Sequence, residues 1–359
     1  MSAKSSVPPA RRLVFALAAA AATAAVLYAG AWTATAYVLQ DQARRWIAAQ
    51  RQDGLQIAHA EPRLSGFPGR VVVTYADWTM AAPVTAGGWT WRAPEIRLAA
   101  APWAPLRFAV DLAGPHALSG VWTPPGVAAT IAAARAELRP VLTAEGRLAE
   151  VAANAEGLSL GPADGPPAIT LGHGALAIAR FGPPAGEALT WRFSLSIAAL
   201  AAPALGELGG LAPAVSRLAV TADLTGPLGP GPLPTALQAW REGGGTVELR
   251  DVVLDWPPLR IDGTGTLALD ERLQPIGAMT AKVRGFFETV DALTARGLVR
   301  SSDAGMARIV LGLLARTPEG GGPPELNLAV TVQDRKLYTG PVTLMDLPAV
   351  TWPSDAILP

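Results

Sequence analysis

The segment from Leu13 to Gln40 contains no charged residue, and it constrains this chain more than any other feature of the sequence. A helix needs about 20 apolar residues to cross the hydrocarbon core of a bilayer, and this segment is longer than that. Its many alanines favour a helix. The sequence therefore predicts a transmembrane helix over residues 13–40, followed by a juxtamembrane helix over residues 41–53.

The charges before the segment predict its orientation. Lys4, Arg11 and Arg12 precede it, and positively charged flanks stay on the cytoplasmic side of a membrane. Residues 1–12 would then form a cytoplasmic N-terminus. Residues 54–359 would form a periplasmic, β-rich domain held at a bacterial inner membrane by a single pass.

A cleaved signal peptide is the alternative interpretation of the same segment. Ala34-Thr35-Ala36 has the small-x-small form of a cleavage site. The apolar part of a signal peptide usually covers about 7–15 residues, however, and this one is about twice as long. Arg45 and Trp46 also follow at the place where an interfacial anchor would lie. These features favour a retained anchor.

The composition excludes several classes of function. The 29 basic residues equal the 29 acidic ones, so the chain lacks the basic excess that nucleic-acid binding requires. Cysteine is absent, which excludes disulfides, thiolate nucleophiles and cysteine-ligated metals. The high content of alanine, glycine and proline is typical of a bacterium with a GC-rich genome.

After residue 54 the apolar residues alternate with polar ones, which is the period-2 pattern of a strand with one buried face. The alternation is clearest in residues 259–269 and continues in residues 279–283. The residues predicted to share one apolar face there are Leu259, Ile261, Leu267, Leu269, Met279 and Val283. The polar residues between them, such as Arg260 and Thr266, would face water.

Proline- and glycine-rich turns such as Pro257-Pro258 separate the alternating runs, a spacing typical of antiparallel meanders. Residues 127–160 are ambiguous between helix and strand, and the strand-rich flanks favour strands. Short helices are predicted over residues 234–242, 286–296 and 301–316, the last capped by Ser301 or Ser302. The predicted fold class is mainly β: one N-terminal membrane helix, then an elongated, twisted, curved and mostly antiparallel sheet with a few short helices.

Residues with the spacing of a catalytic or metal site are not found. His59, His116 and His173 lie far apart and are predicted to be isolated histidines in turns or at the surface. The acidic pairs considered for hydrolysis are Asp251 with Asp255 and Asp262 with Asp270, and these carboxylates are predicted to be solvated on the polar face. The eleven tryptophans are scattered along the chain and are predicted to serve in packing. No catalytic residue, metal or cofactor is therefore predicted.

Short glycine- and proline-based motifs occur in a characteristic order along the chain. Their positions are Gly66, Phe67, Pro68, Arg70, Trp103, Pro105, Gly340 and Pro341. In this order the chain resembles the DUF2125 family, membrane-anchored envelope proteins of alphaproteobacteria. The resemblance implies a single membrane helix and a Gly-(Phe/Tyr)-Pro turn before the first strand, but no activity. Arg335-Lys336 departs from the Asp-Gly expected at the closing turn. In architecture the pattern resembles AsmA-like proteins, whose sheets expose an apolar face.

Three functions remain open. All three have the membrane as a partner, and none of them involves nucleic acid. The favoured one is non-enzymatic binding or shuttling of lipid along the apolar sheet face. The second is an envelope scaffold that binds other proteins and has a closed β core. The third and weakest is a hydrolase of envelope polymers, which would need two carboxylates in one cleft.

Overall fold

The structure is a computed structural model. It describes residues 9–83, 88–112, 114–120, 128–181, 190–202, 211–226, 228–229, 231–318, 321–352 and 357–358. Most of the predicted cytoplasmic segment, residues 1–8, lies outside the described residues.

The elements of the described chain are one long helix, three short helices, one large sheet and one small ladder. The helices are α1 (Pro9–Gln52), α3 (Leu233–Glu242), α4 (Phe286–Ala295) and α5 (Ser301–Leu314). The strands of the large sheet are β1 (Gln56–Ala58), β2 (Arg63–Ser65), β3 (Val71–Ala81), β4 (Thr90–Ala100), β5 (Phe108–Asp111), β6 (Gly114–Ser119), β7 (Ala128–Ala133), β8 (Arg135–Leu142), β9 (Leu148–Pro162), β10 (Ile169–Phe181), β11 (Thr190–Ala201), β12 (Ala214–Thr225), β14 (Thr246–Trp256), β15 (Leu259–Leu269), β16 (Pro275–Arg284), β17 (Glu325–Gln333), β18 (Lys336–Thr339) and β19 (Val342–Asp346). The small ladder pairs β13 (Gly231–Pro232) with β20 (Ile357–Leu358).

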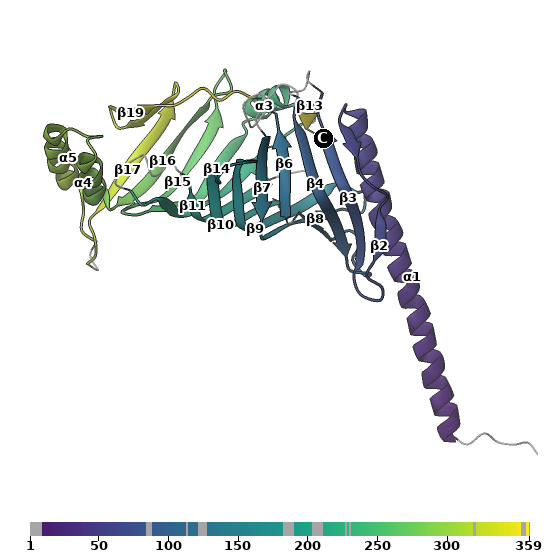
Figure 1. Cartoon of the computed structure of the whole chain (residues 1–359). Helices are drawn as coiled ribbons and strands as arrows, with labels where there is room; N and C mark the ends of the chain where they lie inside the picture. Colours follow the sequence, from purple (N-terminus) through teal and green to yellow (C-terminus); the bar gives the residue numbers. More distant parts are fainter. Residues whose placement is uncertain are drawn as a thin grey trace, which may run out of the picture.

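The large sheet has 18 strands and is antiparallel throughout. From β9 to β19 each strand of this sheet pairs with the one before it in the chain. Nearer α1, β4 pairs with both β5 and β6, and β9 pairs with both β7 and β8, so these short strands act as halves of two longer ones. Figure 1 shows a twisted, curved sheet with β3 and β4 beside α1 and β17, α4 and α5 at the far end. The predicted fold class is confirmed.

The local predictions are mostly confirmed. Residues 128–162 form strands β7 to β9, because each pairs with neighbours on both sides and the sheet overrides the helix propensity of their alanines. The three short helices occur as predicted, although α5 ends at Leu314. The predicted serine cap of α5 is wrong: its cap position is Arg300, in extended backbone, and no side chain caps the helix there.

Helix α1 is continuous across the predicted boundary at residue 40, and its two halves have different surroundings. Residues 14–27 are exposed, whereas Trp32, Leu39 and Ile47 are buried against the sheet. They belong to a core in which Val71 and Val73 of β3 are 0% exposed. The second half of the predicted membrane segment is therefore part of the core of the β domain.

Hydrogen bonds hold this second half of α1 to the strands and their loops. The indole Nε1 of Trp32 donates to the carbonyl of Gly69 at 3.1 Å, and the hydroxyl of Thr35 donates to the carbonyl of Pro102 at 2.7 Å. By length and composition, α1 is the one helix of the described chain that could cross a membrane, a test that an N-terminal signal sequence also passes.

The β17–β18 hairpin yields a stability prediction. Its two loop residues, Asp334 and Arg335, have φ of +49° and +57°, the conformation of a type I′ turn, which favours Asn-Gly or Asp-Gly. Arg335 therefore occupies the position that glycine prefers. The turn pair is Asp334-Arg335, one residue before the Arg335-Lys336 pair at which the family resemblance led us to expect Asp-Gly. We expect Arg335→Gly to stabilise the hairpin by about 0.5–1 kcal/mol, because it relieves left-handed strain.

Hydrogen exchange of the β18 amides measures this effect, with protection rising about threefold for a gain of about 0.65 kcal/mol. Arg335→Ala is the control, since it removes the same side chain but keeps the Cβ atom. Equal protection in the two variants would show that relief of the left-handed strain is not the cause.

Candidate functional site

The side chains of the six residues predicted to form an apolar face all point to the same side of the sheet. They are Leu259, Ile261, Leu267 and Leu269 on β15 and Met279 and Val283 on β16. Val283 is the cross-strand partner of Ile261, and Met279 is the partner of Gly265. Direct partners in a sheet point to the same side, so the register joins the two strands into one surface, here called the apolar face.

The apolar face continues across the sheet in rows of direct cross-strand partners. The row through Gly263 consists of Leu328, Ala281, Gly263, Val252, Val220, Leu195, Leu176, Ala153, Leu138, Val110, Leu98, Val73 and Leu64. The row through Ile261 consists of Leu326, Val283, Ile261, Leu254, Leu218, Ile197, Gly174, Ala155 and Ala136. Neither row contains a polar side chain, although the first crosses most of the sheet and the second crosses half of it.

The degree of burial changes along the row through Gly263. At its β3 end α1 covers the face, and Val73 is fully buried. In the middle of the sheet Leu195 and Val220 are half-buried and Leu176 is 38% exposed. The only other sheet among the described residues is the two-stranded ladder, which is too small to cover this face. The surface that the sequence assigned to lipid or to a closed core is thus an open, single layer here.

The opposite face carries charged residues, and its best-buried group is Asp223 of β12, which is 1% exposed. Arg192 of β11 binds both carboxylate oxygens, at 2.7 and 2.9 Å, and the Nε atom of Arg250 binds one of them at 2.9 Å. The hydrogen bonds from Arg192, supported by Arg250, hold the pKa of Asp223 below its ordinary value. A bulge in β14 supplies Arg250, because the pairing with β12 shifts there by one residue.

A second charged group lies on the same face over β14 to β17. Arg284 binds Glu325 at 2.7 Å and Asp262 at 3.3 Å, and Arg260 binds Asp262 at 3.4 Å and Asp255 at 3.8 Å. Two of the carboxylates considered for hydrolysis, Asp255 and Asp262, are therefore paired with arginines.

A third, Asp270, accepts hydrogen bonds from the backbone amides of Arg272 and Gln274, both at 2.8 Å, so it stabilises its own turn. Among the described residues, no group of three or more His, Asp or Glu is arranged to hold a metal ion.

The prediction for the histidines is wrong for His116. It is buried in β6, and its Nδ1 accepts a hydrogen bond from the indole of Trp91 at 3.2 Å. Its Nε2 must then carry the proton and donate to the carbonyl of Leu112 at 2.6 Å. The pairing of β6 with β4 brings these two residues together, and no local pattern in the sequence signals it.

The tryptophans near α1 are clustered rather than scattered. Trp46 stacks on Trp78, Trp78 stacks on His59, and Trp91 lies beside Trp78. Asp77, with φ of +53°, reverses the alternation of β3, so that Tyr75 and Trp78 both reach the core. Burial raises the pKa of Tyr75, a shift that the nearby Arg44 opposes.

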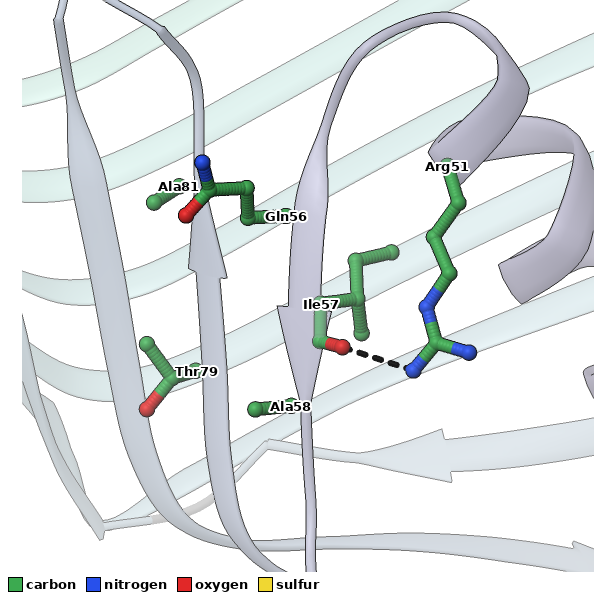
Figure 2. Close-up of a pocket in the computed structure, with 6 residues that line it drawn as sticks. All are labelled: Arg51, Gln56, Ile57, Ala58, Thr79 and Ala81. Atoms are coloured by element: carbon green, nitrogen blue, oxygen red, sulfur yellow. Dashed lines mark hydrogen bonds between the residues drawn. The ribbon is translucent and has the colours of Figure 1, made fainter.

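A small hollow lies where the end of α1 meets β1 and β3 (Figure 2). Its lining is Arg51, Gln56, Ile57, Ala58, Thr79 and Ala81. Arg51, the only ionisable group in it, donates to the carbonyl of Ile57 at 2.7 Å. This hydrogen bond joins the helix to the sheet, and the residues that line the hollow include no carboxylate or histidine.

The family-motif residues fall into two places. The β2–β3 turn brings Gly66, Phe67 and Pro68 against α1, where the hydroxyl of Tyr28 donates to the Pro68 carbonyl. Gly66 has φ of +101°, and a Cβ atom there would overlap the carbonyl oxygen of Arg70. This explains why the motif begins with glycine.

The next two motif residues lie in the neighbouring β4–β5 loop, where Trp103 is exposed and is followed by Pro105. The guanidinium of Arg70 reaches across to β4 and donates to the carbonyl of Ala99 at 3.2 Å. Gly340 and Pro341 form the β18–β19 turn at the opposite edge of the sheet, so the motif residues do not form a single site.

Comparison with known proteins gives one match. The family model described as an uncharacterized protein conserved in bacteria (DUF2125) matches residues 32–348, most of the chain. No curated protein and no solved structure matches. The matched region begins inside α1, at the first residue of the helix that is buried against the sheet. The likeness to AsmA-like proteins stays a prediction.

The Asp223 cluster predicts a dependence of stability on pH. Because the pKa of Asp223 is lowered in the folded state, its contribution is present above its unfolded pKa of about 3.9 and is lost as the pH falls through the folded value. We expect Asp223→Asn to lower the free energy of unfolding by about 2 kcal/mol at neutral pH, since it removes a charged acceptor from two arginines.

Chemical denaturation in detergent at neutral pH and below pH 4 provides the measurement. The difference between the parent and Asp223→Asn should shrink in acid. A difference that is the same at both pH values would show that the ion pairs contribute nothing.

Proposed function

The chain belongs to the DUF2125 family of bacterial proteins, and on that premise we propose that it is a membrane-anchored periplasmic protein that binds lipid acyl chains. The chains lie on the apolar face of its sheet, and the protein performs no chemical reaction on them. The membrane is its permanent partner, through α1.

The observation that carries this proposal is the unbroken, half-exposed apolar face. A stable monomer covers a face of this kind or uses it, because large exposed apolar patches mark binding surfaces. Each CH₂ group that leaves water contributes about 0.8 kcal/mol, so an acyl chain along one row would gain several kcal/mol. Rows without charge offer such a chain no desolvation penalty.

The packing of α1 supports a retained anchor. Cleavage after Ala36 would remove Trp32 and Thr35 from the core, together with their hydrogen bonds to Gly69 and Pro102. The exposed half of the helix, residues 14–27, remains available to lipid. The positive residues before it support a β domain on the far side of the membrane from the cytoplasm.

A second candidate function is the envelope scaffold, favoured by the apolar surface of α5. Met306, Ile309 and Leu313 are exposed and lie three or four residues apart, on one side of that helix. Loss of a co-purified protein after Ile309→Glu, with lipid content unchanged, would favour this function.

A pair of neighbouring substitutions on β15 tests the lipid proposal. Leu267 lies on the apolar face and Thr266 on the opposite one. We expect Leu267→Asp to reduce co-purified lipid about fivefold or more, because the carboxylate would contact the acyl chain. Thr266→Asp introduces the same charge on the wet face and should leave the lipid unchanged.

Native mass spectrometry of detergent-extracted protein measures the bound lipid, and the melting temperature monitors the fold. If the parent carries no lipid and Leu267→Asp unfolds the domain, the face is a packed core and the scaffold function remains. Equal lipid loss in both variants would also contradict the proposal.

A further inference from the structure

Two exposed aromatic residues lie beside α1 at the level where the helix leaves the sheet. Phe67 in the β2–β3 turn is 60% exposed, and Trp103 in the β4–β5 loop is 78% exposed. Figure 1 shows the ends of β2 and β3 beside the middle of α1, with the N-terminal half of the helix projecting beyond them. We call Phe67 and Trp103 the aromatic foot.

The foot is fixed to the helix. The ring of Phe67 meets that of Trp32 edge to face, with 5.5 Å between centroids. Tyr28 and Trp32 donate to the carbonyls of Pro68 and Gly69 in the same turn. The second loop is bound through its Pro102 carbonyl, which accepts from the hydroxyl of Thr35. Both loops are therefore bound at a fixed position along the axis of α1, called here their height on the helix.

The length of the helix places this height at the membrane boundary. Hydrocarbon begins after the charged Arg12, and about 20 residues at 1.5 Å each are needed to cross about 30 Å. That length ends near Trp32, whereas the uncovered residues 14–27 supply only about 21 Å. A tilted helix needs more residues to cross, which would draw the loops deeper and not out of the bilayer.

We propose that the aromatic foot inserts into the lipid headgroup layer on the side of the β domain and holds the domain flat against the bilayer. Large aromatic side chains prefer this region, where their apolar bodies leave water. The exposed guanidinium of Arg70, at the start of β3, is suited to lipid phosphates in the same layer. Leu64, two residues before Gly66, is the terminal residue of the apolar row through Gly263. This end of the row would therefore lie at the membrane surface.

This inference rests on the proposed anchoring by α1, but not on lipid binding by the sheet. The chain contains no cysteine, so a single introduced cysteine can be labelled cleanly with the environment-sensitive fluorophore NBD. The test positions are Phe67→Cys and Trp103→Cys in the full chain. Phe15→Cys, on the exposed half of α1, is the control inside the bilayer, and Val342→Cys on β19 is the exposed control in water.

The variants are reconstituted into vesicles of phosphatidylethanolamine and phosphatidylglycerol that contain a lipid with a headgroup-level nitroxide quencher. We expect the quencher to reduce NBD emission at positions 67 and 103 by about twofold or more relative to position 342. Circular dichroism confirms the fold of each variant. If Phe67→Cys disturbs the turn, Trp103→Cys still tests the inference, because that side chain is the more exposed.

The controls separate two kinds of failure. If position 15 is quenched while positions 67 and 103 behave like position 342, the domain stands away from the bilayer and the inference is wrong. If position 15 is not quenched either, the proposed membrane anchoring fails, and the inference fails with it.

Discussion

The packing of α1 against β3 is the contact on which the rest of the structure depends. Leu39 is 1% exposed and Val71 and Val73 are 0% exposed, and burial of side chains of this size contributes about 1.5–3 kcal/mol each. Elsewhere the side chains of the sheet are largely half-buried. Each of them therefore contributes less free energy of burial than a fully buried side chain does. The helix therefore covers the first strands and gives the remaining strands a rigid edge from which to extend.

Beyond that edge the two faces of the sheet are held by different forces. The apolar face is stabilised by contacts between aliphatic side chains that lie side by side on paired strands. The charged face gains from arginines that bridge carboxylates on neighbouring strands, most completely at Asp223, where the bulge in β14 turns Arg250 toward the buried carboxylate. Because exposed ion pairs contribute only about 0.2–1 kcal/mol each, the partly buried Asp223 cluster matters more than the number of surface pairs.

The sequence predicted what depends on local pattern and missed what depends on distant pairing. Alternation in residues 259–269 predicted the strand and its faces, because a repeat of two residues matches the pleat of a strand and not the turn of a helix. It did not predict that Trp91 and His116 would meet, since only the pairing of β4 with β6 brings them together. Nor could the uncharged segment reveal that Trp32 and Leu39 contact protein, because an apolar side chain satisfies lipid and protein equally well.

The order of strand pairing has a consequence for how the chain folds as it is synthesised. Most strands of the large sheet pair with the strand immediately before them, so contacts are short in sequence and each loop closes at a small entropic cost. A chain delivered from its N-terminus can add one strand at a time to an edge that α1 and β3 have already started. On the growing side of the sheet only the newest strand has an unpaired edge open to aggregation, and the short β18–β19 hairpin ends the growth there.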